Sequence, residues 1–156
     1  MELHYGDIRL TELTNYRKKA IRVLSKSKYN AHTAPIFKQE NLLSILDIYK
    51  LNCLKFYHKY INAKLPEYFK DFFKHPSHRY NTRNTLPDIP HSRTNISKNR
   101  LRHYIPTLLR NSIDENIISK VHTHSLYGFS QYVKRVYIAK YQTECLIPNC
   151  YICNTT

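Results

Sequence analysis

The stretch NLLSILDIYKLNCLKFYHKYINAKLPEYFKDFF, residues 41–73, decides the fold of this chain. Apolar and aromatic side chains recur in it at steps of three and four residues, the repeat of an α-helix with one buried face. The residues that follow this repeat are Leu42, Ile45, Leu46, Tyr49, Cys53, Phe56, Tyr57 and Tyr60. Ile48, Leu51 and Leu54 widen the apolar stripe, so we expect neighbouring elements to contact this helix on more than one side.

Proline residues set the limits of the main helix and of the short helices beside it. The main helix is expected to end at Leu65, because the residue before a proline is displaced from the helical region. A short helix, Glu67–Phe73, is expected directly after Pro66. On the other side, Thr33-Ala34-Pro35 predicts the start of a short helix at Pro35–Glu40, since proline is tolerated in a first helical turn.

A basic helix is predicted before these elements. Its apolar stripe contains one arginine and consists of Leu10, Leu13, Arg17, Ala20, Ile21 and Leu24. The segment from residue 17 to residue 28 carries no acid, and its cations are Arg17, Lys18, Lys19, Arg22, Lys26 and Lys28. An ordinary solvated helix face mixes acids with bases, so this composition favours a face that contacts phosphate groups.

The amino-acid composition of the chain changes at Lys74. The segment 74–104 contains three prolines and an excess of Lys and Arg over acids, which excludes one long helix and favours turns and extended backbone. Short strands or a hairpin are expected near Arg79–Arg83 and Ile89–Ile96. Helices are expected again after this segment, at Thr107–Arg110 after Pro106, at Glu115–Val121 with Asp114 as N-cap, and at Leu126–Tyr141 with Ser125 as N-cap.

These elements predict a mainly α fold. We expect a helical region at 1–73, a basic irregular connecting segment at 74–104, and C-terminal helices with a cysteine-containing tail at 105–156, packed as one compact unit. The net charge of +14 in 156 residues predicts a polyanionic partner, RNA or DNA, in preference to a membrane. No secretory signal and no membrane-spanning run is evident, and the cysteines do not form a disulfide framework, so an intracellular location, nucleus or cytoplasm, is expected.

Two groups of residues raise the question of metal chemistry. The adjacent acids Asp114-Glu115 lie at a predicted helix start, where acids usually serve the helix dipole, so we do not expect a catalytic metal pair there. The spacing Cys145-x4-Cys150-x2-Cys153 is a candidate zinc site with three thiolates, and the fourth ligand would be His122, His124 or a partner's residue. The alternative is a reduced tail without metal.

Two further residues of interest lie on the main helix. Cys53 is expected to be a buried small side chain, and His58 is expected to be a surface residue.

Several segments, in order, resemble the region that follows the catalytic palm in non-LTR (LINE-type, jockey-like) retrotransposon reverse transcriptases. YRKKAIRVL resembles the family's LQKRAIRII, and AHTAPIF resembles AHTxPLF. HRYNTRN resembles HxYNTR, and IPHSRTNISKNRLRHYIPTLL resembles PxxRTNxxKxSIRYxGPxxWN. In this sequence these segments are residues 16–24, 31–37, 78–84 and 89–109. The Cys-bearing end YQTECLIPNCYIC, residues 141–153, looks like that of some members.

The resemblance implies a thumb and post-thumb region of an RNA-directed DNA polymerase, present as a fragment or a truncated gene product. Such a region would bind the template–primer duplex next to the missing palm and fingers, and would form a thumb-like helical bundle. The chain lacks the family's Tyr/Phe-x-Asp-Asp metal site, so we expect no polymerase activity from it alone. The family's GPxxWN is altered at Tyr104–Asn111, where its Gly and Trp are lost, which affects the expected turn and packing there.

The predicted nucleic-acid-binding residues come from three basic segments. They are Arg17, Lys18, Lys19, Arg22, Lys26, Arg79, Arg83, Arg93, Arg100 and Arg102. Tyr80 and Tyr104 lie among these cations and could stack on unpaired bases or serve as core anchors. Two other functions stay open: a protein-interaction module that docks its basic face on an acidic partner, and a small zinc-binding protein.

Overall fold

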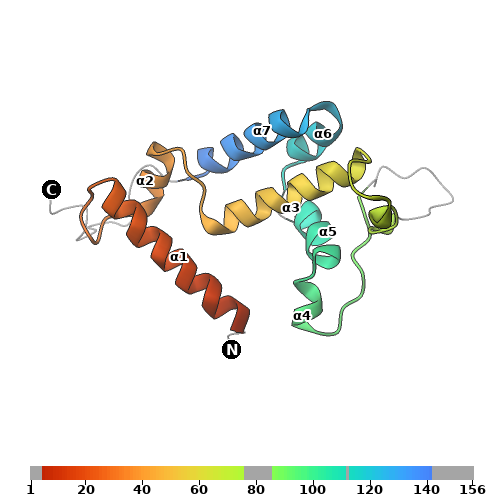
Figure 1. The fold of residues 1–156 in the computed structure, drawn as a ribbon, viewed down its shortest axis with the longest axis horizontal. Helices are drawn as coiled ribbons and strands as arrows, with labels where there is room; N and C mark the ends of the chain where they lie inside the picture. Colours follow the sequence, from red (N-terminus) through yellow and green to blue (C-terminus); the bar gives the residue numbers. More distant parts are fainter. Residues whose placement is uncertain (1–4, 76–85, 112, 142–156) are drawn as a thin grey trace. The chain divides into compact units, whose positions relative to one another are not determined.

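The computed structural model describes residues 5–75, 86–111 and 113–141. This part of the chain is helical and contains no strand, which confirms the mainly α prediction (Figure 1). Its elements are α1 Tyr5–Leu24, α2 Thr33–Gln39, α3 Ile45–Ile61, the 3-10 helix η1 Glu67–Phe69, α4 Asn95–Lys98, α5 Leu101–Asn111, α6 Glu115–Thr123 and α7 Leu126–Ala139. No helix among these residues combines the length and hydropathy that crossing a membrane requires.

The chain divides into two units. Unit 1 combines residues 1–49 with residues 134–156, and unit 2 is the continuous segment 50–133. The boundaries fall inside α3 and inside α7. Each unit has its own set of buried side chains, so each is described separately.

A small apolar cluster holds unit 1 together. Ile21 of α1 is buried together with Ile36 and Phe37 of α2, and Ala31 and Tyr141 pack against these three side chains. The α1 residue in this cluster belongs to the apolar stripe predicted from the sequence. The cluster explains why the seven residues of α2 form a helix at all, because a helix this short depends on tertiary packing of its apolar face.

Polar contacts around Tyr141 fix the first turn of α3. The Ser44 hydroxyl accepts a hydrogen bond from the Asp47 N–H at 3.2 Å and donates one to the Asp47 carboxylate at 2.7 Å. The Tyr141 hydroxyl accepts from the Ser44 N–H at 2.8 Å and donates to the same carboxylate. Lys38 of α2 donates to the Tyr141 carbonyl at 3.1 Å. These bonds satisfy donors that a helix start leaves without partners.

Unit 2 is built around the apolar faces of α3, α5, α6 and α7. Its most buried aliphatic and aromatic side chains expose 1% of their surface or less, and they include Leu54, Ile105, Leu109, Ile117, Val121, Phe129 and Val133. Cys53 is a buried small side chain on α3, as the sequence predicted. Phe73 extends the core at the other end of α3, where its ring meets those of Tyr57 and Tyr60 edge-on.

His58 lies inside this core, so the prediction of a surface residue is wrong. Its side chain is 1% exposed, and its ring stacks on Phe129 with 5.0 Å between centroids. Its Nε2 lies 2.9 Å from the carbonyl oxygen of His124, and its Nδ1 has no hydrogen-bond partner. A carbonyl oxygen only accepts hydrogen bonds, so the His58 Nε2–H donates this one. Asn62 adds a second link, donating to the Val121 carbonyl at 3.1 Å.

Three helices end in the same hydrogen-bonded turn, and none of them uses glycine. At the end of α3, the Lys64 N–H donates to the Lys59 carbonyl at 2.8 Å and the Ala63 N–H donates to the Tyr60 carbonyl at 3.1 Å. This pair of bonds is the Schellman motif, which needs one residue in the left-handed region. In α1, α2 and α3 that residue is Lys26, Asn41 and Ala63, with φ near 52°, 52° and 51°.

Two predicted helices are shorter in the structure. The main helix covers Ile45–Ile61 and stops before Leu65, because the left-handed Ala63 ends it earlier than Pro66 would. The predicted helix Glu67–Phe73 forms only the single turn of η1. The Tyr60 hydroxyl donates to the Phe73 carbonyl at 3.3 Å and helps to hold the turn that follows.

The middle segment contains more helix than predicted. α5 begins at Leu101 and places Pro106 in its interior, so the prediction that Pro106 starts a helix is wrong. Burial explains the difference, because Ile105 and Leu109 lie one turn apart and both enter the core.

No strand forms in the described part of 89–96. Thr94 instead starts α4 by accepting a hydrogen bond from the Ser97 N–H at 3.2 Å. Residues 79–83, the other predicted strand, lie outside the described residues.

The starts of the last two helices agree with the sequence. Asp114 occupies the N-cap of α6, although its side chain makes no capping hydrogen bond there. Ser125 precedes α7, and its hydroxyl accepts from the Gly128 N–H at 3.2 Å. α7 ends at Ala139, two residues before the predicted limit.

The positive φ of Ala63, in the turn after α3, predicts that glycine at this position stabilises the protein. Ala63→Gly should raise the free energy of unfolding by about 1 kcal/mol, because a Cβ is disfavoured at positive φ. Ala20→Gly is the matched control: Ala20 is exposed within α1, where glycine should cost roughly 1 kcal/mol. Urea unfolding of both variants measures the difference. Equal signs for the two substitutions would contradict the assigned backbone at Ala63.

Tyr141 predicts a loss of stability at alkaline pH. Burial and the hydrogen bond to Asp47 raise its pKa from 10.0 to about 12, and burial raises the pKa of Tyr57 similarly. A pKa that is higher in the folded state gives stability that is present below pH 10 and lost as pH rises toward 12.

Tyr141→Phe should therefore reduce the alkaline loss, leaving the part due to Tyr57 and Tyr104, whose pKa values burial also raises. At neutral pH it should cost about 1–2 kcal/mol, because Ser44 and Asp47 each lose a hydrogen-bond partner. Thermal unfolding at about pH 8 and about pH 11, on either side of the ordinary tyrosine pKa, checks both effects. An alkaline loss as large in the variant as in the unchanged protein would refute this account of Tyr141.

Candidate nucleic-acid interface

The cations of α1 separate into two groups. Arg17 and Arg22 are half-buried on the side of α1 that contacts α2 and the preceding loop. The Arg17 guanidinium lies 5.8 Å from the centroid of the Phe37 ring, within the range of a cation–π contact. Lys18 and Lys19 are exposed on the rest of the helix. The sequence placed all four in one binding set.

Arg22 holds a loop in place. Its Nε donates to the carbonyl of Ala31 at 2.8 Å, across the loop that joins α1 to α2. A charged donor on a carbonyl is one of the stronger hydrogen bonds in proteins. The Arg22 guanidinium therefore already forms a hydrogen bond within the protein, and the main role of Arg22 is structural.

The exposed cations continue beyond the end of α1. Lys26 is exposed in the left-handed position of the terminal turn, and Lys28 is exposed in the loop that follows. We refer to Lys18, Lys19, Lys26 and Lys28 as the exposed α1 cations. No acid lies among them in the sequence, so their fields add over a short stretch of surface.

The apolar stripe predicted for α1 is only partly used. Ile21 is buried, but Leu13 is 55% exposed and Leu24 is 78% exposed. Tyr16 and Val23 are exposed as well. The expectation that the whole stripe packs on a core is wrong for Leu13 and Leu24, because α2 is only about two turns long and covers the region around Ile21.

A second group of predicted cations lies around α4 and α5 in unit 2. Arg93, Arg100 and Arg102 are all exposed, and all three precede or begin α5. Tyr104 is half-buried, and burial raises the pKa of its hydroxyl. Its partial burial favours a packing role for Tyr104 over stacking on a base.

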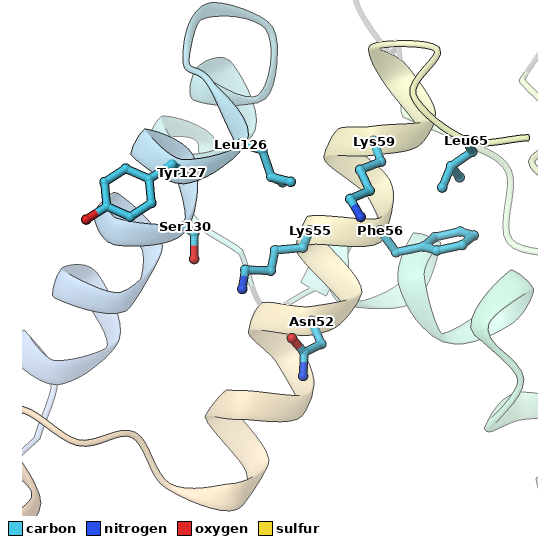
Figure 2. Close-up of a pocket in the computed structure, with 8 residues that line it drawn as sticks. All are labelled: Asn52, Lys55, Phe56, Lys59, Leu65, Leu126, Tyr127 and Ser130. Carbon is cyan, nitrogen blue, oxygen red and sulfur yellow. The ribbon is translucent and has the colours of Figure 1, made fainter.

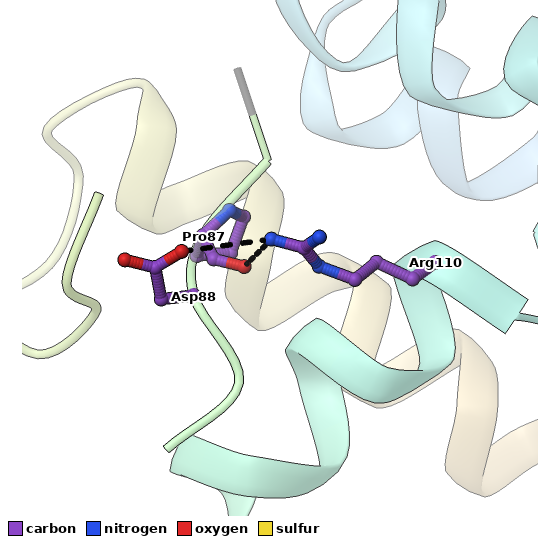
Figure 3. Close-up of polar contacts among 3 residues, drawn as sticks. All are labelled: Pro87, Asp88 and Arg110. Atoms are coloured by element: carbon purple, nitrogen blue, oxygen red, sulfur yellow. Dashed lines mark hydrogen bonds and ion pairs between the residues drawn. The ribbon is translucent and has the colours of Figure 1, made fainter. Parts of the chain in front are cut away.

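Arg110, near the end of α5, fixes the segment that leads into this basic region. Its Nη2 donates to the Pro87 carbonyl at 3.0 Å and lies 3.7 Å from the Asp88 carboxylate (Figure 3). The ion pair is long and partly exposed, so it contributes little by itself. The Asp88 N–H donates to the Lys74 carbonyl at 2.7 Å, which ties the segment to the residues after η1.

Several predicted site residues lie outside the described residues: Arg79, Arg83, Tyr80, Cys145, Cys150 and Cys153. The histidines considered as a fourth zinc ligand are described. His122 is exposed, and His124 Nδ1 lies 2.9 Å from the Thr123 hydroxyl. Across the described segments, no three His, Cys, Asp or Glu side chains are grouped as a metal site would need.

A pocket of about 490 Å³ lies between α3 and α7 in unit 2. Lys55 projects from α3 toward α7, and Leu126 projects from α7 toward α3 (Figure 2). The lining residues are Asn52, Lys55, Phe56, Lys59, Leu65, Leu126, Tyr127 and Ser130. The two lysines were not among the cations predicted from the sequence. Their spacing of four residues on a mostly apolar helix was the available signal.

No protein-family model, no curated protein and no solved structure matches this chain. Its function is therefore inferred from the charges, burial and contacts of its own residues.

The division of the α1 cations predicts different effects of substitution. Arg22→Ala should lower the free energy of unfolding by roughly 1–3 kcal/mol, because the Ala31 carbonyl loses a charged donor. Lys18→Ala and Lys19→Ala should stay within about 0.5 kcal/mol of the unchanged protein. Urea unfolding at fixed ionic strength measures all three.

Arg22→Lys is the control for charge in this series. It keeps the positive charge but removes Nε, so it should be destabilised almost as much as Arg22→Ala. Full stability of Arg22→Lys would show that charge, and not the hydrogen bond to Ala31, is what Arg22 contributes.

Proposed function

We propose that this chain is the non-catalytic thumb and post-thumb part of a non-LTR retrotransposon reverse transcriptase, and that it binds template–primer nucleic acid. The observation that carries the proposal is the set of exposed α1 cations, which has no acid among its members. Lysine ammonium groups placed this way bind phosphates without regard to base sequence, because binding releases counterions from the nucleic acid.

The order of the family-like segments supports the same proposal. YRKKAIRVL forms the second half of α1. AHTAPIF leads into α2 and forms most of it. RTNISK contains the N-cap Thr94 and the whole of α4. Each of these three segments thus coincides with an element or with the start of one. A helical architecture also suits a thumb, which needs stiff elements beside a duplex.

The chain would act beside a catalytic part that supplies the metal-binding carboxylates. Its own contribution would be electrostatic: the exposed lysines of α1 bind phosphates, and the contact with α2 holds that helix in place. The exposed arginines at positions 93, 100 and 102 are further candidate phosphate contacts within unit 2. Such an interface gives affinity that falls steeply with salt.

Salt titration tests the proposed interface. The protein should bind a labelled RNA–DNA hybrid at low salt, with affinity that falls as salt rises. Replacing Lys18, Lys19 and Lys26 by Ala should reduce the slope of log K against log salt by about 0.9 for each phosphate that is no longer neutralised. Fluorescence anisotropy over a series of salt concentrations gives the slope.

A matched triple variant distinguishes a specific effect of the α1 lysines from the general effect of lowering the net charge. Lys64, Lys70 and Lys74 are exposed lysines outside the proposed interface, and their substitution by Ala removes the same charge. This control should change the slope much less than the α1 variant does. Equal slopes for the two variants would remove α1 as the interface, and a protein that binds no nucleic acid would end the proposal.

A protein partner is the second candidate, and the exposed apolar residues of α1 favour it. Leu13, Tyr16, Val23 and Leu24 are each more than half exposed on the same helix that carries the cations. An acidic partner with an apolar centre, such as the missing palm, would fit this combination. Loss of binding to an acidic partner in the α1 lysine variant, together with unchanged nucleic-acid binding, would favour this second function over the first.

A further inference from the structure

The pocket between α3 and α7 is lined by residue types that neither the packing of the core nor the α1 surface explains. It is lined by two lysines, three groups that can donate or accept hydrogen bonds, and three apolar side chains. None of the eight lining residues is an acid. A concave surface with cations and no counter-charge concentrates positive potential, because its low-dielectric walls focus the field.

Lys55 and Lys59 stand one helical turn apart on α3. Like charges at this spacing repel each other and destabilise a helix by a few tenths of a kcal/mol. Both side chains are half-buried, and neither ammonium group has a hydrogen-bond or ion-pair partner among the described residues. The arrangement is unfavourable for the protein alone and becomes favourable when an anion lies between the two ammonium groups.

The α7 side of the pocket adds neutral donors and an aromatic ring. Ser130 contributes a hydroxyl that is half-buried beside Lys55 (Figure 2). Tyr127 is 75% exposed at the rim and belongs to the first turn of α7. An exposed tyrosine next to a cationic pocket is the arrangement that stacks an unpaired base while the neighbouring phosphate is neutralised.

We infer that this pocket binds a backbone phosphate of single-stranded nucleic acid through Lys55, Lys59 and Ser130, with an adjacent base stacked on Tyr127. The inference rests on the proposed function, since it takes nucleic acid as the partner. It adds a second binding site, in unit 2, that differs in substrate class from the α1 surface. The α1 cations bind phosphates of any strand, whereas this pocket requires an unpaired base.

The full chain and two labelled probes of equal length, a short oligodeoxythymidine and a short DNA duplex, test the inference. Lys55→Gln with Lys59→Gln should weaken binding of the single strand about tenfold or more at low salt. It should also reduce the slope of log K against log salt by about 0.7, because one phosphate of the single strand is no longer neutralised. Duplex affinity should change no more than in the control.

The control removes two charges elsewhere in unit 2, at the exposed residues Lys70 and Lys74. Lys70→Gln with Lys74→Gln should weaken binding of either probe by less than about threefold. Tyr127→Ala keeps the charge and removes the stacking surface, so it should weaken single-strand binding roughly tenfold and leave the salt slope unchanged.

Folding is checked on the same proteins by thermal unfolding. Lys55→Gln with Lys59→Gln should unfold at or above the temperature of the unchanged protein, because the repulsion between the two ammonium groups is removed. A large fall in that temperature would mean that the lysines stabilise the fold, and would overturn the inference that they are held for an anion.

The outcomes separate this inference from the proposed function. If the unchanged protein binds both probes but the pocket variant behaves like its control, the pocket inference is overturned and the proposed function stands. If the pocket variant loses both probes equally, the preference for a single strand is overturned. If the protein with substituted α1 lysines still binds the single strand and the pocket variant does not, the pocket is supported over α1. Binding of neither probe by the unchanged protein overturns both.

Discussion

Unit 2 depends on one buried imidazole. His58 joins α3 to the turn between α6 and α7 through its contact with the His124 carbonyl, and its ring lies against Phe129. A polar ring among apolar side chains is costly unless it is hydrogen-bonded, and the contact with the His124 carbonyl offsets part of that cost. The Nδ1 atom has no hydrogen-bond partner, and a buried polar atom without a partner loses its hydration without compensation. Through these contacts His58 also joins the two helices, α3 and α7, that form the walls of the pocket.

The sequence predicted the helical character of the chain because periodicity is a local property. Ser125 identified the start of α7 to the residue, since a hydroxyl before a helix has a direct local partner in the Gly128 N–H. Pro106 misled the prediction for α5. A proline is normally read as a helix start, and its place inside a helix is decided by the burial of Ile105 and Leu109, which depends on distant segments. His58 was misjudged for the same reason, because its partners are His124 and Phe129.

The candidate site was predicted less completely than the fold. Charge composition identified the α1 segment, but it treated Arg17 and Arg22 as equal to Lys18 and Lys19. Only the position of Phe37 and of the Ala31 carbonyl separates the two groups. Lys55 and Lys59 were not identified, because their significance comes from α7, which lies far along the sequence from α3. Residue type predicts the affinity for an anion, whereas tertiary structure decides which cations remain available for it.

The division of the chain into a continuous and a discontinuous unit bears on the order in which it folds during synthesis. Unit 2 is complete once Val133 has left the ribosome, and its helices can then form their shared core. Unit 1 requires Tyr141 to reach Ser44 and Asp47, whose segment is made much earlier. Ile21, Ile36 and Phe37 of α1 and α2 can pack before then, whereas the hydrogen bonds that fix the first turn of α3 need the residues that follow α7. The polar contacts at the start of α3 are therefore the last part of unit 1 to form during synthesis.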